Sequence, residues 1–119
     1  MAVTKDITDQ GANLELVLGD SYLNADRTGI EFTESTAGVW PDLTGAGAAV
    51  NLKIGAFSKA GTIVTAGASA PQKVRFDITA AENVSAAFPD RWYQYQVYAT
   101  FTAPSKKTLV TGLCNVRRF

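Results

Sequence analysis

The residue types that most often carry chemistry in proteins are scarce in this chain. It has no histidine, which removes the commonest general base, the usual partner of a serine or cysteine nucleophile, and the commonest metal ligand. The single cysteine, Cys114, stands in an apolar strand pattern, whereas reactive thiols need an electropositive, partly open site, so we expect a buried, inert thiol. The 11 carboxylates are spread along the chain, without the pairing that a glycosidase needs. We therefore predict that the protein is not an enzyme.

Two stretches come close to binding motifs without matching them. Asp20, Asn24 and Asp26 could together ligate calcium. Their spacing differs from that of an EF-hand loop, whose ligands alternate and include a glycine at the sixth position, so we interpret them as a solvated turn. Residues 45–50, GAGAAV, lack the third glycine of a dinucleotide fingerprint and lead into a strand rather than a helix. We therefore predict neither a metal nor a cofactor.

One stretch is suited to contact with another molecule, residues 91–101, RWYQYQVYATF. Its side chains alternate between two faces with the period of a β-strand. The odd-numbered face is suited to a core, whereas the even-numbered face, which includes Trp92 and Tyr98, is too aromatic for plain solvent. These two aromatic residues could bind a sugar or another protein, or they could pair with neighbouring strands inside a sandwich. Both interpretations stay open at this point.

The two ends of the chain are further candidates for contact. Residues 1–12 are polar and lack a clear period, so they form either an extended arm, ordered only where something holds it, or a frayed terminus. The last three residues combine two guanidinium groups with an aromatic ring, which suits either a docking peptide or a solvated tail. The predicted partner-binding residues are thus Val3, Lys5 and Ile7 in the arm, Trp92 and Tyr98 in the strand, and Arg117, Arg118 and Phe119 at the end.

Short strands separated by turns must position these residues. Residues 58–61 (SKAG) predict a hairpin-type turn, with residues 62–66 as the returning strand. Gly112, in the middle of the last strand, predicts a bulge or a close backbone approach. Apolar and polar residues alternate, or apolar residues occupy both faces, in residues 14–18, 30–33, 48–56, 62–66, 73–78 and 107–116.

One helix is predicted among these strands. Thr79 and Glu82 have the spacing of a capping box, and residues 88–90 (FPD) would end the helix, so we expect a short helix over about residues 79–88. Trp40 and Leu43, on either side of Pro41, are expected to enter the core from a bend. About seven or eight short strands at regular spacing predict an all-β protein with the architecture of a β-sandwich.

Composition sets further bounds. A chain of 119 residues is expected to form one domain, here residues 13–119, with residues 1–12 as the arm. Its formal net charge of zero argues against nucleic acid as a partner. No apolar run approaches the roughly 20 residues of a membrane span, and the first residues, MAVTKD, lack the apolar region of a signal peptide. We expect a soluble protein, made in a cytoplasm, without a membrane partner.

Several stretches, in this order and spacing, resemble small virion proteins of tailed bacteriophages with an immunoglobulin-like or jelly-roll-like β-sandwich. Similar domains occur in capsid decoration (cement) proteins, at the base of head fibres and in the N-terminal part of upper baseplate proteins. The resemblance covers most of the chain. It is carried by residues 19–26 (GDSYLNAD) with 30–32 (IEF), 40–46 (WPDLTGA), 76–82 (FDITAAE), 93–97 (YQYQV) and 108–112 (TLVTG).

This resemblance implies a structural role and transfers no catalytic residue. Baseplate and fibre members usually continue into a stalk or receptor-binding domain, whereas this chain stops at Phe119. A decoration protein on the capsid surface is therefore expected, made in the host bacterial cytoplasm. Its implied partners are the major capsid protein or other virion structural proteins, and it would form a homo-oligomer, often a trimer.

Two other hypotheses remain. One is a tail, baseplate or fibre-adaptor protein, which is structural but sits at the host-facing end of the virion. The other is a carbohydrate-binding module with Trp92 and Tyr98 as its exposed platform.

Overall fold

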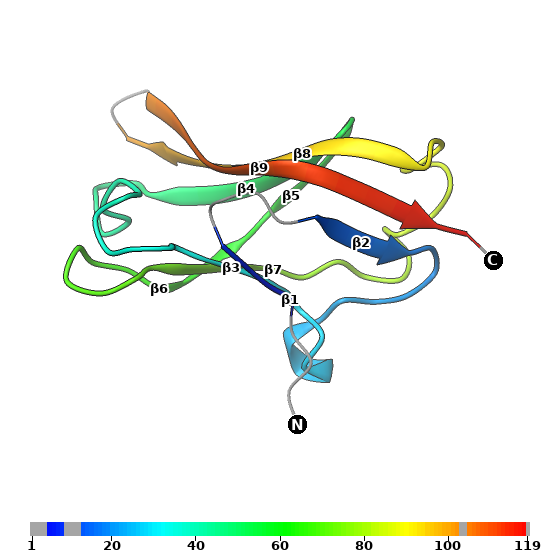
Figure 1. The fold of residues 1–119 in the computed structure, drawn as a ribbon, viewed down its shortest axis with the longest axis horizontal. Helices are drawn as coiled ribbons and strands as arrows, with labels where there is room; N and C mark the ends of the chain where they lie inside the picture. The colour runs from blue at the N-terminus through cyan, green and yellow to red at the C-terminus, as the bar shows by residue number, and fades with distance from the viewer. Residues whose placement is uncertain (1–4, 9–12, 103–104, 119) are drawn as a thin grey trace.

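The computed structural model describes residues 5–8, 13–102 and 105–118. Over these residues the chain is all-β and forms a sandwich of two sheets, which confirms the predicted fold class (Figure 1). One 3-10 turn, η1 (Asn24–Asp26), interrupts the connection between the second and third strands. The nine strands are β1 (Lys5–Thr8), β2 (Leu14–Val17), β3 (Ile30–Thr33), β4 (Ala49–Ile54), β5 (Phe57–Ala60), β6 (Thr62–Thr65), β7 (Lys73–Phe76), β8 (Trp92–Phe101) and β9 (Ser105–Arg117).

Part of the strand order matches that of an immunoglobulin-like sandwich. One sheet has the order β1-β3-β7-β6 and the other β2-β9-β8-β4-β5. The segments β3-β7-β6 and β9-β8-β4 correspond to the B-E-D and G-F-C arrangements of that fold, with β5 as an added edge strand. β1 runs parallel to β3 and β2 parallel to β9, while the other pairs are antiparallel. The N-terminal segment therefore contributes a strand to each sheet.

The core lies between the two sheets and is organised by aromatic rings. The ring of Phe32 on β3 lies 5.7 Å from that of Tyr95 on β8 and 5.9 Å from that of Phe76 on β7, measured between centroids. Such offset and edge contacts add to the stabilisation that burial itself provides. Trp40 and Leu43 are both buried in this core, as the sequence predicts.

The predicted helix at residues 79–88 is wrong. The two reciprocal bonds of the capping box do form: the Thr79 amide donates to the Glu82 carboxylate at 3.0 Å, and the Glu82 amide donates to the Thr79 hydroxyl at 3.2 Å. The segment nevertheless continues as turns. The carbonyl of Asn83 accepts from the Gly19 amide at 2.9 Å, so a tertiary contact uses the acceptor that a helix would direct to residue 87.

The predicted hairpin turn is also displaced. β4 and β5 pair across a two-residue turn whose first residue, Gly55, has a φ of 58°, which matches the position where a tight hairpin requires positive φ. The residues expected to turn thus form β5, and β6 pairs with β7 in the opposite sheet. With β1, this added strand raises the number from the predicted seven or eight to nine.

Gly61 alone separates β5 from β6, so the chain changes sheets within a single residue (Figure 1). A Cβ atom at this position would lie 2.4 Å from the ring of Phe76 and 2.7 Å from the carbonyl oxygen of Arg75. Both are closer than van der Waals contact allows. Only glycine therefore fits this crossing without a shift of its surroundings.

A buried polar pair fixes the long connection that contains Trp40. The Glu34 carboxylate accepts from the amides of Trp40 at 2.5 Å and Gln72 at 3.1 Å. The Gln72 side chain in turn accepts from the Leu43 amide at 2.8 Å. Both polar side chains are buried, and these bonds provide the partners that buried polar groups require.

Candidate functional site

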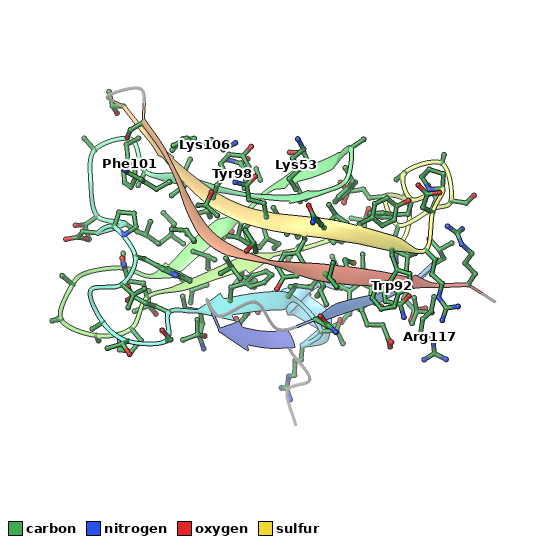
Figure 2. All side chains as sticks on the ribbon, turned by 45° about the horizontal axis from the view of Figure 1, so that its top comes forward. Lys53, Trp92, Tyr98, Phe101, Lys106 and Arg117 are labelled. Carbon is green, nitrogen blue, oxygen red and sulfur yellow. The ribbon has the colours of Figure 1, made fainter. Side chains whose placement is uncertain are left out.

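The outward surface of the five-stranded sheet is the candidate site, and we call it the outer face. Alternation along β8 directs Tyr95, Val97 and Ala99 into the core and leaves the even-numbered residues on the outer face. The register then places Lys53 of β4 beside Gln96. Side chains from three neighbouring strands therefore form this surface (Figure 2).

One end of the outer face exposes apolar side chains. Trp92, at the start of β8, is 53% exposed, and Leu113 on β9 is 46% exposed. Asn115 lies directly opposite Trp92 and Leu113 opposite Gln94, so Trp92 and Leu113 are diagonal neighbours, within reach of a large aromatic side chain. The two residues form one exposed apolar patch.

A hollow of about 810 Å³ adjoins this patch. Its lining combines the apolar patch with polar side chains and with two glycines, Gly55 and Gly112. A Cβ atom on Gly112 would lie 2.6 Å from the ring of Tyr95, which confirms the predicted close approach. The predicted bulge, however, falls elsewhere: the register shifts where Val97 pairs with Val110 and Tyr98 with Thr108, which makes Leu109 the extra residue.

Three arginines gather at the same end. Arg91 donates to the Asn115 side chain at 3.3 Å, and Arg117 lies 3.6 Å from the Glu15 carboxylate. Arg118 donates to the backbone carbonyls of residues 88 and 90, each at 2.6 Å. The three side chains and Val116 surround a second hollow of about 290 Å³. Arg118 is therefore bound to its own chain, and the arginines add a basic border to the apolar patch.

The other end of the outer face carries Tyr98. The ammonium group of Lys106 lies over the Tyr98 ring, 4.3 Å from its centroid, which is a cation–π arrangement. Tyr98 lies six positions after Trp92 along β8, a distance of about 20 Å. Figure 2 shows the two at different ends of the strand. They do not form one aromatic platform.

Charge is unevenly distributed between the strands and the loops. The five strands of this sheet contain one carboxylate, Glu15, and five cations, Lys53, Lys59, Lys106, Lys107 and Arg117. Lys59 points inward and contacts Glu82 at 2.9 Å. Outside the strands, the described residues include three cations, Arg27, Arg91 and Arg118, and seven carboxylates, Asp20, Asp26, Glu34, Asp42, Asp77, Glu82 and Asp90. A protein of zero net charge thus has a basic outer face.

Burial and hydrogen bonds alter the pKa values of several side chains. Burial raises the pKa of the Cys114 thiol to about 12, in agreement with the predicted inert cysteine. Burial, and secondarily the charge of Cys114, raises the pKa of Tyr95 to about 12. Hydrogen bonds, first from the Thr79 amide and then from Lys59, lower the pKa of Glu82. Within the described residues, no group of three or more acidic or cysteine side chains is placed to hold a metal ion.

The residues predicted to bind partners lie in different parts of the structure. Trp92 and Arg117 lie at one end of the outer face and Tyr98 toward the other. Lys5 and Ile7 belong to β1, aligned with Ile30 and Phe32 in the other sheet. Val3 and Phe119 lie outside the described residues.

Sequence reasoning did not select Lys53, Leu113 or Arg91 for this site. Alternation alone places Lys53 outward, because its neighbours Leu52 and Ile54 are apolar. The position of Lys53 beside β8 depends on the register between β4 and β8, which are distant in sequence. No local sequence pattern predicts that register.

Comparisons with protein-family models, with curated proteins and with solved structures found no match. Among the described residues, no helix has the length and apolar character needed to cross a membrane.

Proposed function

We propose that this protein is a structural binding protein of a tailed-bacteriophage virion that decorates the outer surface of the head. The observation that carries the proposal is the outer face, where an exposed apolar patch, Trp92 and Leu113, has a basic border. Depletion of carboxylates beside exposed aromatic and arginine residues is typical of protein interfaces. The resemblance to phage sandwich proteins, carried by residues 19–26, 30–32, 40–46, 76–82, 93–97 and 108–112, supports the virion as its place.

The dimensions of the outer face suit a modest protein contact. β8 has ten residues, which span about 33 Å, and five strands extend about 19 Å across the sheet. The face therefore offers about 600 Å² at most, somewhat less than the ~800 Å² per partner of a standard interface. Contacts of this size hold well when a lattice repeats them and an oligomer makes several at once.

We accordingly propose the major capsid protein, or another virion structural protein, as the partner, and a homo-oligomer, favouring a trimer, as the binding form. Sedimentation analysis of the purified protein tests this assembly. A trimer would support the proposal, whereas a monomer at all concentrations would contradict the oligomeric part of it.

The decisive experiment is co-sedimentation of the purified protein with expanded phage heads. We expect wild-type protein to bind at on the order of hundreds of copies per head, which would favour the head over the tail, and Trp92→Ala to bind about tenfold or more weakly, as loss of an interface anchor does. Val64→Ala is the matched control, because Val64 is 43% exposed on the opposite sheet. Binding to tails but never to heads would replace the proposal with a tail or baseplate role.

A second candidate is carbohydrate binding, which the large hollow beside Trp92 favours, because it combines an exposed ring with the amides of Gln94 and Gln96. A glycan screen tests it with wild-type protein and Trp92→Ala. Loss of a specific glycan signal in the variant would support this function, and an unchanged screen would eliminate it.

A further inference from the structure

The cations of the outer face stand at intervals along the sheet. Lys53 lies in the row of Gln96, and Lys106 lies opposite Thr100. Four residues separate these rows along β8, which corresponds to about 13 Å. Arg117 lies beyond the row of Trp92, at the other end of the sheet. Uncharged side chains occupy the intervals between these cations.

The one carboxylate in these strands is already engaged. Glu15 lies 3.6 Å from Arg117 and pairs in register with Asn115. Lys53 and Lys106 therefore have no carboxylate of their own sheet beside them. The attraction between either lysine and a carboxylate on a partner protein is not weakened by a carboxylate of the same sheet.

We propose that the outer face binds a protein surface rich in carboxylates, with Lys53 and Lys106 opposite those groups and Trp92 packed against an apolar side chain at the other end of the face. This inference deepens the proposed function and rests on it for the identity of the partner, which would be an acidic region of the capsid surface. Charge complementarity of this kind steers the encounter and selects the register of docking.

The spacing of the cations favours a protein over a nucleic acid. A DNA duplex carries one charge per ~1.7 Å of its axis, and its binding proteins meet it with many closely placed cations. Cations that stand about 13 Å apart, with glutamine and tyrosine between them, match separate carboxylates on a folded surface better than a continuous phosphate chain.

The test is a titration of isotope-labelled full-length protein with two peptides about as long as β8, one alternating Glu with Leu and the other Lys with Leu. We expect the acidic peptide to shift amide signals of β4, β8 and β9, and the basic peptide to leave them unchanged. A dissociation constant of about 1 mM is sufficient for detection. Raising the salt from about 0.05 to 0.3 M should weaken the binding, because the charges are exposed.

Two charge reversals complete the test. Lys53→Glu should weaken binding of the acidic peptide by about threefold to tenfold. Arg27→Glu, which changes net charge equally at an exposed loop position, should leave it unchanged. Equal shifts with both peptides, no shifts, or shifts confined to the other sheet would overturn the inference. Tighter binding of an oligothymidylate, or self-association through the same face, would also overturn it and identify the occupant instead.

Failure of the proposed function gives a different experimental result from failure of this inference. If the acidic peptide binds as expected but heads do not bind wild-type protein, the surface chemistry stands and the proposed partner is wrong. If heads bind wild-type and Lys53→Glu protein equally, the decoration role stands and the acidic partner surface is wrong.

Discussion

At the scale of the residue, two buried acids contribute to the response of the fold to alkali. Cys114 and Tyr95 are both buried, and burial raises each pKa to about 12. In an unfolded chain a cysteine ionises near pH 8.5 and a tyrosine near pH 10. Between these values and about pH 12, the folded state therefore holds protons that the unfolded state has lost.

The free energy of unfolding should consequently be unaffected by these groups near pH 7 and fall as the pH rises from about 9 to 12. Each group contributes a slope of about 1.4 kcal/mol per pH unit once it is ionised in the unfolded state. Urea unfolding at a series of pH values measures the slope. Cys114→Ala should reduce it near pH 9, where most cysteine but little tyrosine is ionised in the unfolded chain. An unchanged slope in this variant would contradict the expected role of the thiol.

The buried carboxylate of Glu34 leads to a second prediction. Both of its oxygens accept from backbone amides, those of Trp40 and Gln72. In Glu34→Gln one oxygen becomes an NH₂ group, which cannot accept, so one buried amide loses its partner. We expect a loss of about 1–3 kcal/mol in the free energy of unfolding, measured by urea titration. Asp26→Asn, at an exposed carboxylate, should change it by less than about 0.5 kcal/mol.

The candidate site was predictable only in part at this scale. Alternation in β8 correctly separated the core-facing Tyr95 from the exposed Trp92. It could not show that Lys106 covers Tyr98 or that Leu113 lies diagonal to Trp92. Those neighbours depend on the β8–β9 register, including the bulge at Leu109, and that register is set by packing rather than by any local signal.

At the scale of the element, tertiary contacts decided where local signals failed. The capping box of Thr79 and Glu82 forms, but the helix does not. The next residue, Asn83, is held by tertiary contacts, because its side-chain amide donates to the carbonyls of Val17 and Asp20 at 2.7 and 2.9 Å. Lys59, which the sequence predicts in a turn, lies in strand β5 and contacts Glu82. Strands with strict alternation, such as β3 and β7, were predictable, because a period of two residues places apolar side chains on the buried face and polar side chains on the exposed face.

The crossing at Gly61 is the element-scale feature most open to test. Gly61→Ala would place a methyl group against the Phe76 ring and the Arg75 carbonyl oxygen. Because β5 ends at Ala60 and β6 begins at Thr62, neither strand can move alone to relieve the contact. We expect a loss of about 1–3 kcal/mol, as other overpacked sites show, measured by urea unfolding. Ala60→Ser, at the exposed neighbouring position, is the control, and an equal loss there would contradict this explanation.

At the scale of the whole molecule, one core joins the two sheets. The Phe32 ring on β3 contacts rings from both β7 and β8, and the chain passes between the sheets repeatedly, most directly at Gly61. Neither sheet can therefore keep its buried face covered after the other has separated. A domain of this size with a single core is expected to unfold in one step.

The two tryptophans allow a direct measurement. Trp92 is exposed and Trp40 is buried, so fluorescence of the Trp92→Phe variant reports on Trp40 alone. We expect its urea transition to coincide with that of the far-ultraviolet circular dichroism, because loop, core and sheets unfold together. Two separated midpoints would show that the connection around Trp40 opens independently of the sheets.

The parallel pairing of β2 with β9 has a mechanical consequence. β2 lies near the start of the described chain and β9 at its end, and their residues are paired from Leu14 with Cys114 to Val17 with Arg117. Tension applied between the two ends pulls these strands past each other along their length. The hydrogen bonds between them must then break together rather than one after another, and the rate of forced unfolding reflects that barrier. The β2–β9 pair is thus loaded in shear when the two ends are pulled apart, and this is the geometry in which paired strands best resist separation.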